Sequence, residues 1–309
     1  MPACQGAGEK GDHVNLPLLL AVLATGQGCQ EVEALARRAY EERHYHDAAK
    51  QFARAISECG QSSPLLLALG QSQLLAQKRA DAVATLERIG TEDAEYVQSL
   101  KVKARALYLL HRDPEAEDTL KRAAARAPAD AEIPYHLGRI YYQQGRHSEA
   151  ADAFRRATTI DPEGYAAWDN LGLATEALGD VAQAQRHYLK AIALVHKDHP
   201  RYDVVYANFA DLLIRAGNFR QAFDLAAEAA QRNPDEPRNF FLAGKALVHL
   251  EQSDVSVRWF EQAIKLNPDY PEPRYLLSQV YRKLGRIEDA ERELKQFEEA
   301  RARAPKERR

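Results

Sequence analysis

Apolar residues recur along the chain at helical spacing, in short stretches separated by helix-breaking residues. Within residues 131–164, the apolar positions around Leu137 predict one amphipathic helix, and those around Phe154 predict a second. Gly145 breaks the chain between the two helices, and Pro162 ends the second. Neither helix is apolar enough to bury itself alone, so the pair needs a neighbouring pair on each side.

The same helix pair recurs every 34 residues, with one slip of four residues, in eight copies. Two positions in every copy hold Gly, Ala or Ser, and a bulky residue stands four places after the second of them in all copies but the one with Ala226. Small residues are expected where paired helices cross, because a larger side chain would push the helix axes apart. The copies span residues 29–62, 63–96, 97–130, 131–164, 165–198, 203–236, 237–270 and 271–304. The small positions are Ala36, Gly70, Ala104, Gly138, Gly172, Ala210, Gly244 and Ser278 in the first helices, and Ala48, Ala82, Ala116, Ala150, Ala184, Ala222, Ser256 and Ala290 in the second.

This pattern resembles the tetratricopeptide repeat family, whose units carry an aromatic residue, Leu-Gly, Tyr, Ala, Phe and Pro in that order. The resemblance covers nearly all of residues 29–304 and implies an all-α, right-handed superhelical solenoid of antiparallel helix pairs. It also implies a scaffold for binding other proteins, although members of such a family do many different jobs. The matching residues are Leu137, Gly138, Tyr141, Ala150, Phe154 and Pro162 in one copy, and Trp168, Leu171, Gly172, Ala184 and Tyr188 in the next.

The repeats predict one continuous domain over residues 29–304, preceded by residues 1–28 and followed by a basic tail at 305–309. A chain of 309 residues would ordinarily suggest two domains, but a solenoid is a single body whose core runs lengthwise. The slip at 199–202 adds about one helical turn. We therefore expect the second helix of the fifth copy to be one turn longer and to end before Pro200; a loop insertion is the alternative.

The region before the repeats contains the apolar run Leu16–Ala24, which is too short to span a membrane as a helix. The run fits the apolar part of a signal peptide cleaved near Gly26. Lys10 is the only fixed positive charge ahead of the run, which argues against export. A short helix covering the open end of the first copy is the other interpretation, and a cytoplasmic location is favoured over an exported one.

The three cysteines, Cys4, Cys29 and Cys59, fit no metal-binding spacing. Cys29 and Cys59 stand at opposite ends of the first copy, and two antiparallel helices would bring these ends together. A disulfide between them is the alternative if the protein is exported, whereas two ordinary thiols are the favoured interpretation when the compartment is not known.

Charge and motifs argue against several classes of function. A formal net charge of −3 gives no electrostatic case for binding nucleic acid or an anionic membrane. The sequence contains no phosphate-binding loop, dinucleotide fingerprint, zinc-protease motif or nucleophile elbow, and too few residues lie outside the copies to form a catalytic domain. We expect no enzyme activity and no cofactor. Two histidine clusters, His44 with His46 and His196 with His199, each lack a convincing third metal ligand.

The first helix of each pair lines the concave side of such a solenoid, so its inward residues are the candidates for ligand contact. Arg and Tyr are favoured interface anchors, and an Asn amide can hold an extended backbone. Arg105 and Arg139 should form a cationic step about 10 Å across, which suits an acidic peptide. An acidic step at Asp169, Glu176 and Asp211 should repel such a peptide and fix its direction. The candidate peptide-binding residues are Lys101, Arg105, Tyr108, Tyr135, Arg139, Tyr142, Asn170 and Asn208.

The predicted function is a non-catalytic scaffold that binds a protein or peptide in the groove of the solenoid. One alternative is an exported factor for cell-envelope assembly or secretion. A second alternative is an enzyme-associated subunit with a weak metal site at a histidine cluster. The sequence names neither the partner nor the oligomeric state.

Overall fold

The computed structural model describes residues 27–303, and the side chains of all of these except 27–28 and 196–198. This part of the chain is all-helical, with sixteen α-helices and no strand. It divides into two compact units at Pro162, which we call unit 1 (residues up to 162) and unit 2 (residues from 163), and each is described by itself. The predicted signal peptide and the basic tail at 305–309 lie outside the described residues. The continuous domain expected over residues 29–304 stays a prediction.

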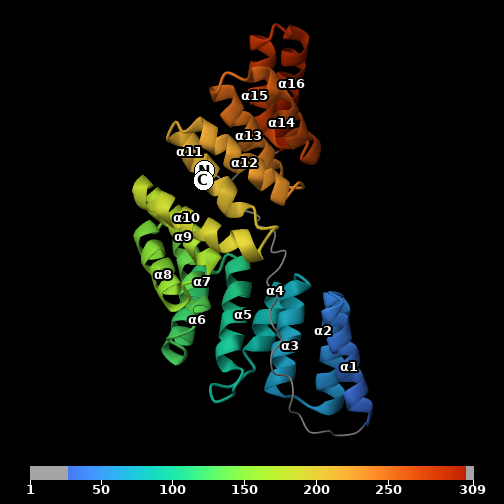
Figure 1. Ribbon diagram of the computed structural model, residues 1–309. Helices are drawn as coiled ribbons and strands as arrows, with labels where there is room; N and C mark the ends of the chain where they lie inside the picture. Colours follow the sequence, from blue (N-terminus) through green and yellow to red (C-terminus); the bar gives the residue numbers. More distant parts are fainter. Residues whose placement is uncertain (1–26, 304–309) are drawn as a thin grey trace. The chain divides into compact units, whose positions relative to one another are not determined.

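Each unit is a row of antiparallel helix pairs, as the repeat predicts (Figure 1). The predicted fold class, an all-α helical solenoid, is confirmed in this respect. Unit 1 comprises α1 (Gln27–Glu41), α2 (Tyr45–Cys59), α3 (Ser63–Leu75), α4 (Arg79–Leu86), α5 (Tyr96–Leu109), α6 (Asp113–Arg126), α7 (Glu132–Gln143) and α8 (His147–Ile160). Unit 2 comprises α9 (Tyr165–Ala177), α10 (Val181–Asp198), α11 (Val204–Arg215), α12 (Phe219–Arg232), α13 (Pro237–His249), α14 (Ser253–Leu266), α15 (Pro271–Lys283) and α16 (Ile287–Arg303).

Every pair turns through one residue in the left-handed backbone conformation, at the same position of each copy. The residue after it donates its N–H to the carbonyl five residues earlier, as Arg146 does to Tyr141 at 2.9 Å. This bond closes the C-terminal end of the first helix. Glycine occupies this turn position in four copies. In the other four the residue carries a side chain, and its left-handed conformation costs about 1 kcal/mol. The turn residues are Arg43, Gln77, His111, Gly145, Gly179, Gly217, Glu251 and Gly285.

Within a pair, the small position of the first helix packs against the bulky position of the second. A Cβ atom added at Gly172 would lie 2.6 Å from the ring of Tyr188, and one added at Gly138 would lie 2.6 Å from the ring of Phe154. Real Cβ atoms do not approach that closely, so each ring lies directly on the glycine backbone. The structure thereby refines the prediction: the small position of the first helix meets the bulky residue of its partner helix.

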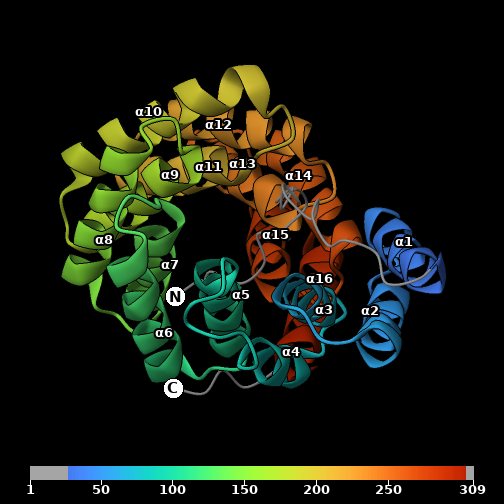
Figure 2. The same cartoon turned by 90° about the horizontal axis from the view of Figure 1, so that it is seen from below.

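The first helices of neighbouring pairs also contact one another, so that they form a layer of their own. In unit 1, α5 contacts α3 on one side and α7 on the other. In unit 2, α11 contacts α9 and α13, and Figure 2 shows these three helices inside the layer formed by α10 and α12. The core of each unit lies between its two layers, with Leu107 and Ile140 fully buried in unit 1 and Tyr188 fully buried in unit 2.

The four-residue slip lengthens a helix, as expected, since α10 continues to Asp198. The residues that follow α10 contact side chains of α9 and of α12 within unit 2. The ring of Tyr165 lies 4.4 Å from that of His199 and 4.7 Å from that of Tyr202. The Arg232 guanidinium donates to the carbonyl of His199 at 3.4 Å. The inserted turn is therefore a packed part of unit 2.

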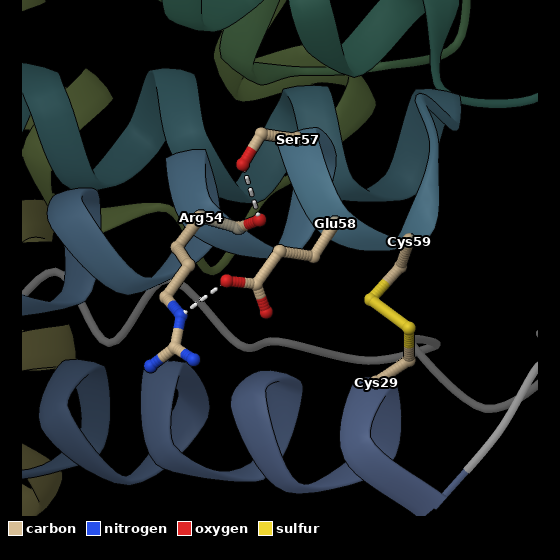
Figure 3. Close-up of a disulfide and its surroundings, with 5 residues drawn as sticks. All are labelled: Cys29, Arg54, Ser57, Glu58 and Cys59. Carbon is tan, nitrogen blue, oxygen red and sulfur yellow. Dashed lines mark hydrogen bonds and ion pairs between the residues drawn. A yellow bond between two sulfur atoms is a disulfide. The ribbon is translucent and has the colours of Figure 1, made fainter.

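A disulfide joins Cys29 near the start of α1 to Cys59 at the end of α2, with the two Cα atoms 5.7 Å apart (Figure 3). The preferred expectation of two ordinary thiols is wrong in this structure. The antiparallel pairing brings the outer ends of the two helices within bonding distance, and the bond closes a sequence separation of 30 residues. A cross-link of that span typically stabilises a fold by about 2–4 kcal/mol.

The glycine contact with Tyr188 generates a test of the register. Gly172→Leu should lower the free energy of unfolding by about 2–3 kcal/mol, because the added side chain overpacks the contact between α9 and α10. Ala182→Leu, on the exposed face of α10, is the matched control and should be close to neutral. Urea denaturation of both variants measures the difference. Equal stability of Gly172→Leu and the native chain would show that the register is wrong.

Candidate ligand-binding surface

The structure brings Arg105 and Arg139 together, although they are 34 residues apart in sequence. Arg105 extends from α5 and Arg139 from α7, and both line one cavity with Tyr108 and His136. Ala104, Leu109, Leu120 and Ile140 complete its lining. The two arginines of the predicted cationic step therefore line a small cavity together with aromatic and apolar side chains.

The electrostatics of this cavity are those of crowded positive charge. Burial and the neighbouring Arg139 lower the pKa of Arg105. Burial, together with the positive charges of Arg139, Arg105 and Lys101, lowers the pKa of His136 to about 3. At neutral pH the imidazole of His136 is therefore uncharged, and the cavity carries two guanidinium groups beside a neutral ring.

Two tyrosines position the Arg139 side chain. Its guanidinium carbon lies 5.2 Å from the ring centre of Tyr108 and 5.9 Å from that of Tyr135. Such cation–π contacts attract a guanidinium to an aromatic face. Tyr135 in turn packs against Phe154 of α8, with the ring centres 6.0 Å apart. Arg139 is thus held between an α5 ring and an α7 ring.

Two other candidates of unit 1 are used within the unit. The Lys101 ammonium lies 2.8 Å from a carboxylate oxygen of Asp130 and also contacts Glu132, and its side chain is only 13% exposed. Lys101 therefore fastens α5 to the segment that leads into α7. Tyr142 packs its ring against His147 at the start of α8, with the centres 5.1 Å apart.

The two candidate amides of unit 2 are also engaged within their unit. Asn170 donates to the carbonyl of Ala166, one turn earlier in α9, at 2.8 Å. Asn208 donates to the Asp169 carboxylate at 3.0 Å and accepts from Arg238 at 2.9 Å. Both contacts satisfy the Asn208 amide without a ligand.

The acidic step expected in unit 2 is neutralised, which corrects the prediction that it repels an acidic ligand. Glu176 accepts from the Tyr188 hydroxyl at 2.9 Å and pairs with the Arg215 guanidinium. Asp211 lies 3.5 Å from Arg215, 4.0 Å from Arg238 and 3.9 Å from Lys245. These carboxylates face cations of neighbouring first helices, so they contribute little repulsion. Asp169, the third member, is 1% exposed.

Two residues with notable surroundings were not among the sequence-based candidates. His136 lines the same cavity as Arg105 and Arg139 but is absent from the candidate residues; its signal in the sequence is its position three residues before Arg139. The role of Tyr202, which donates to Asp169 at 2.9 Å from within the slip, was not foreseen either.

The histidine clusters do not assemble a metal site in the described residues. His44 lies 3.7 Å from Glu42 at an exposed turn, and His199 packs against Tyr165. No group of three or more His, Cys, Asp or Glu side chains that could hold a metal ion occurs in that part of the chain. No helix of residues 27–303 combines the length and the apolar character needed to cross a bilayer.

A row of antiparallel helix pairs with a lined inner face defines a class of protein-interaction scaffolds. Three models described as tetratricopeptide repeat match the chain, one at residues 102–165 and 207–271, one at 165–235 and one at 257–306. A tetratricopeptide-repeat protein of Pseudomonas aeruginosa, PA0015, is 31% identical over 74 residues, which are 24% of this chain and 70% of that protein. The chain belongs to the tetratricopeptide repeat family, whose repeats serve as scaffolds for protein–protein interaction.

Longer relatives share part of their length with this chain. The type IV pilus assembly protein PilF of P. aeruginosa is 27% identical over 158 residues, covering 50% of this chain and 60% of PilF. YpiA of Bacillus subtilis, a repeat-containing protein, is 22% identical over 233 residues, covering 65% of this chain and 55% of YpiA. The chain therefore spans a little over half the length of these two relatives.

Solved structures agree on the fold. A tetratricopeptide repeat protein from Parabacteroides merdae superposes with a TM-score of 0.63 at 17% identity, covering 82% of this chain and 99% of that one. A structure from a functional characterisation of P. aeruginosa PilF gives a TM-score of 0.60 at 21% identity, covering 70% of this chain and 97% of that one. At these identities the likeness concerns the fold.

The buried carboxyl of Asp169 generates a prediction on pH. Burial raises its pKa to about 6, against the opposing hydrogen bonds from Asn208 and Tyr202. The folded state therefore holds this proton more tightly than the unfolded state does. The stability that Asp169 contributes is greatest below its ordinary pKa of 3.8 and is lost as the pH rises through 6.

Asp169→Asn should remove this pH dependence, because the amide resembles the protonated acid. Relative to the variant, the native chain should lose up to about 3 kcal/mol of unfolding free energy between pH 4 and pH 7. Urea denaturation across that range measures the difference, with Asp235→Asn, at an exposed turn, as the control. Parallel curves for the native chain and Asp169→Asn would contradict the prediction.

Proposed function

We propose that the chain is a non-catalytic scaffold that binds a protein or peptide partner on the first-helix face of unit 1. The observation that carries the proposal is the cavity where Arg105 and Arg139, from adjacent helices, meet Tyr108. Arg and Tyr dominate binding energy at protein interfaces when they are well packed and desolvated. Both arginines are partly buried here, so a ligand that contacts them meets charges that water screens weakly.

The other candidates take supporting roles in this proposal. Tyr135 orients Arg139, and Lys101 fixes the spacing of α5 and α7 through its ion pairs. Tyr142 stands one turn beyond Arg139 in α7 and extends the aromatic surface. Asn170 and Asn208 would act on a ligand only after exchanging their present hydrogen bonds.

A paired charge reversal tests the proposed surface. Arg105→Glu with Arg139→Glu should weaken capture of the native partner about a hundredfold or more, because two cations facing a ligand become repulsive. Affinity purification of the tagged chain from its native cell, with quantitative mass spectrometry, measures capture.

Arg155→Glu with Arg156→Glu, exposed on α8, changes the net charge equally and is the control. Circular dichroism establishes that each variant folds, and Arg105→Gln with Arg139→Gln serves if the reversal disturbs folding. A partner that is captured equally by the folded arginine variants and the native chain would refute this surface.

A second candidate function is an exported factor for the assembly of a cell-envelope structure. The disulfide between Cys29 and Cys59 supports it, because such bonds persist in oxidising compartments and are rare in the cytosol. The similarity to PilF, a pilus assembly protein, points the same way. This function is compatible with a protein-binding surface on unit 1.

Thiol trapping in the native cell tests the second candidate. If the protein is exported, Cys29 and Cys59 should resist alkylation by a maleimide reagent until a reductant is added. The mass of the protein fragments that contain these cysteines reports whether the reagent has reacted. Labelling after reduction controls for access of the reagent to the two cysteines. Complete labelling of both cysteines without a reductant would place the protein in a reducing compartment.

A further inference from the structure

We propose that unit 1 binds a small carboxylic acid with a compact apolar body in a pocket beside the end of α4. This pocket, which we call the α4 pocket, shares no lining residue with the cavity of Arg105 and Arg139. The inference therefore goes beyond the proposed function. The lining residues that matter most are Leu86, Ile89, Ser99, Leu100, Lys103 and Arg122.

The α4 pocket lies where the second helix of its copy stops early. Helix α4 ends at Leu86 after eight residues, whereas α6 and α8, the second helices of the next two copies, have 14 residues each. Residues 87–95 continue to α5 as turns. The pocket beside this early end has a volume of about 190 Å³. An engineered protein cavity of about 150 Å³ holds benzene, so the α4 pocket has room for a ring with one substituent.

A lysine lines the α4 pocket at a position where other copies bury a leucine. The equivalents of Lys103 in the second and fifth copies are Leu69 and Leu171, which are 5% and 1% exposed. The side chain of Lys103 is also largely covered, at 16% exposed, and its ammonium lies 2.7 Å from a carboxylate oxygen of Glu87. An ammonium has three N–H donors, and Glu87 accepts from one of them, so Lys103 retains donors for a ligand oxygen.

The second cation of the α4 pocket, Arg122, is held by a neutral group. Its guanidinium donates to the Tyr96 hydroxyl at 2.5 Å, and its carbon lies 6.0 Å from the centre of the Tyr96 ring. These contacts orient the guanidinium without neutralising its charge. Arg122 is exposed, whereas Ser99 is 2% exposed. The cation therefore stands at the mouth of the pocket, and a ligand can reach it from the solvent.

The apolar part of the lining supports a ligand with an apolar body. Leu86, Ile89 and Leu100 are each at most 5% exposed, so the ligand body would be removed from water where it contacts them.

The charges of the lining select a carboxylate. Lys103 and Arg122 outnumber the single acid, Glu87, and both cations form charge-assisted hydrogen bonds with carboxylate oxygens. A cationic ligand would face two like charges. A phosphate monoester, which carries up to two negative charges, would be repelled more strongly by Glu87 than a singly charged acid. The arrangement therefore favours one carboxylate on a small ring or branched chain, as in benzoate.

Nuclear magnetic resonance of the full chain tests the inference. Isoleucine methyl groups labelled with carbon-13 report binding, because Ile89 lines the α4 pocket and Ile140 lines the cavity of Arg105 and Arg139. An Ile89→Val variant assigns the Ile89 signal. Benzoate should shift this signal to saturation and leave the Ile140 signal in place. Benzamide has the same shape without the charge and should bind about tenfold more weakly or worse, since it lacks the charge-assisted hydrogen bonds.

Variants distinguish the α4 pocket from general electrostatics. Arg122→Gln should weaken benzoate binding about tenfold or more for the same reason. Arg156→Gln is the matched control, because Arg156 is exposed at the equivalent position of α8, and it should leave binding unchanged. Lys103→Leu restores the residue of other copies and should abolish binding. Circular dichroism establishes that each variant folds.

The inference is overturned if benzoate leaves the Ile89 signal unchanged, if benzamide binds equally well, or if folded Arg122→Gln binds benzoate as tightly as the native chain. Tighter binding of a blocked dipeptide that ends in phenylalanine would also overturn it, since the pocket would then take the end of a protein chain. None of these outcomes bears on partner capture by Arg105 and Arg139, so the two proposals fail separately.

Discussion

The contact between a small residue of the first helix and a bulky residue of the second fixes the rotation of both helices in a pair. Gly138 against Phe154 and Gly172 against Tyr188 leave no room for a Cβ atom, so each first helix has one orientation relative to its partner. The residue after the small position then lies about 100° further round the helix, away from the second layer. In unit 1 this position holds Arg105 and Arg139. The packing that builds the core thereby sets where the inner face carries its charges.

The two units differ in the charges that they carry at this position. The position after the small residue is Asp211 in α11 and Lys245 in α13, and these opposite charges lie 3.9 Å apart. In α5 and α7 the same position holds two arginines, which repel each other. In unit 2 the charges at this position form ion pairs within the unit, whereas in unit 1 two like charges stand on adjacent first helices. The same backbone arrangement thus carries an ion pair in one unit and two arginines in the other.

The sequence repeat predicted the helix pairs because the same pattern recurs in eight copies. A departure from the pattern in one copy therefore does not hide it. The lengthening of α10 to Asp198 was predictable for the same reason, since a slip of one helical turn keeps the buried face in phase. The left-handed turn was visible in sequence only where it is a glycine. Arg43 and Gln77 adopt the same conformation, although neither residue type predicts it. The hydrogen bonds around the turn offset a conformational cost of about 1 kcal/mol.

Contacts between side chains of different helices were harder to predict, because they depend on how the adjacent helices pack. The sequence placed Cys29 and Cys59 at neighbouring helix ends, yet the favoured interpretation kept them reduced since composition does not report the compartment. Asn208 had the residue type and position of a ligand contact. Its amide was already satisfied by Asp169 and Arg238, from the helices on either side. Predicting these hydrogen bonds requires the distances between neighbouring helices, and the pattern within one helix does not give those distances.

His136 shows why the chemistry of unit 1 depends on arrangement more than on residue type. An isolated histidine on a helix would titrate near its ordinary pKa of 6.5, whereas here burial and three cations lower its pKa to about 3. Two of those cations, Arg105 and Lys101, belong to α5, so the shift depends on the packing of α5 against α7.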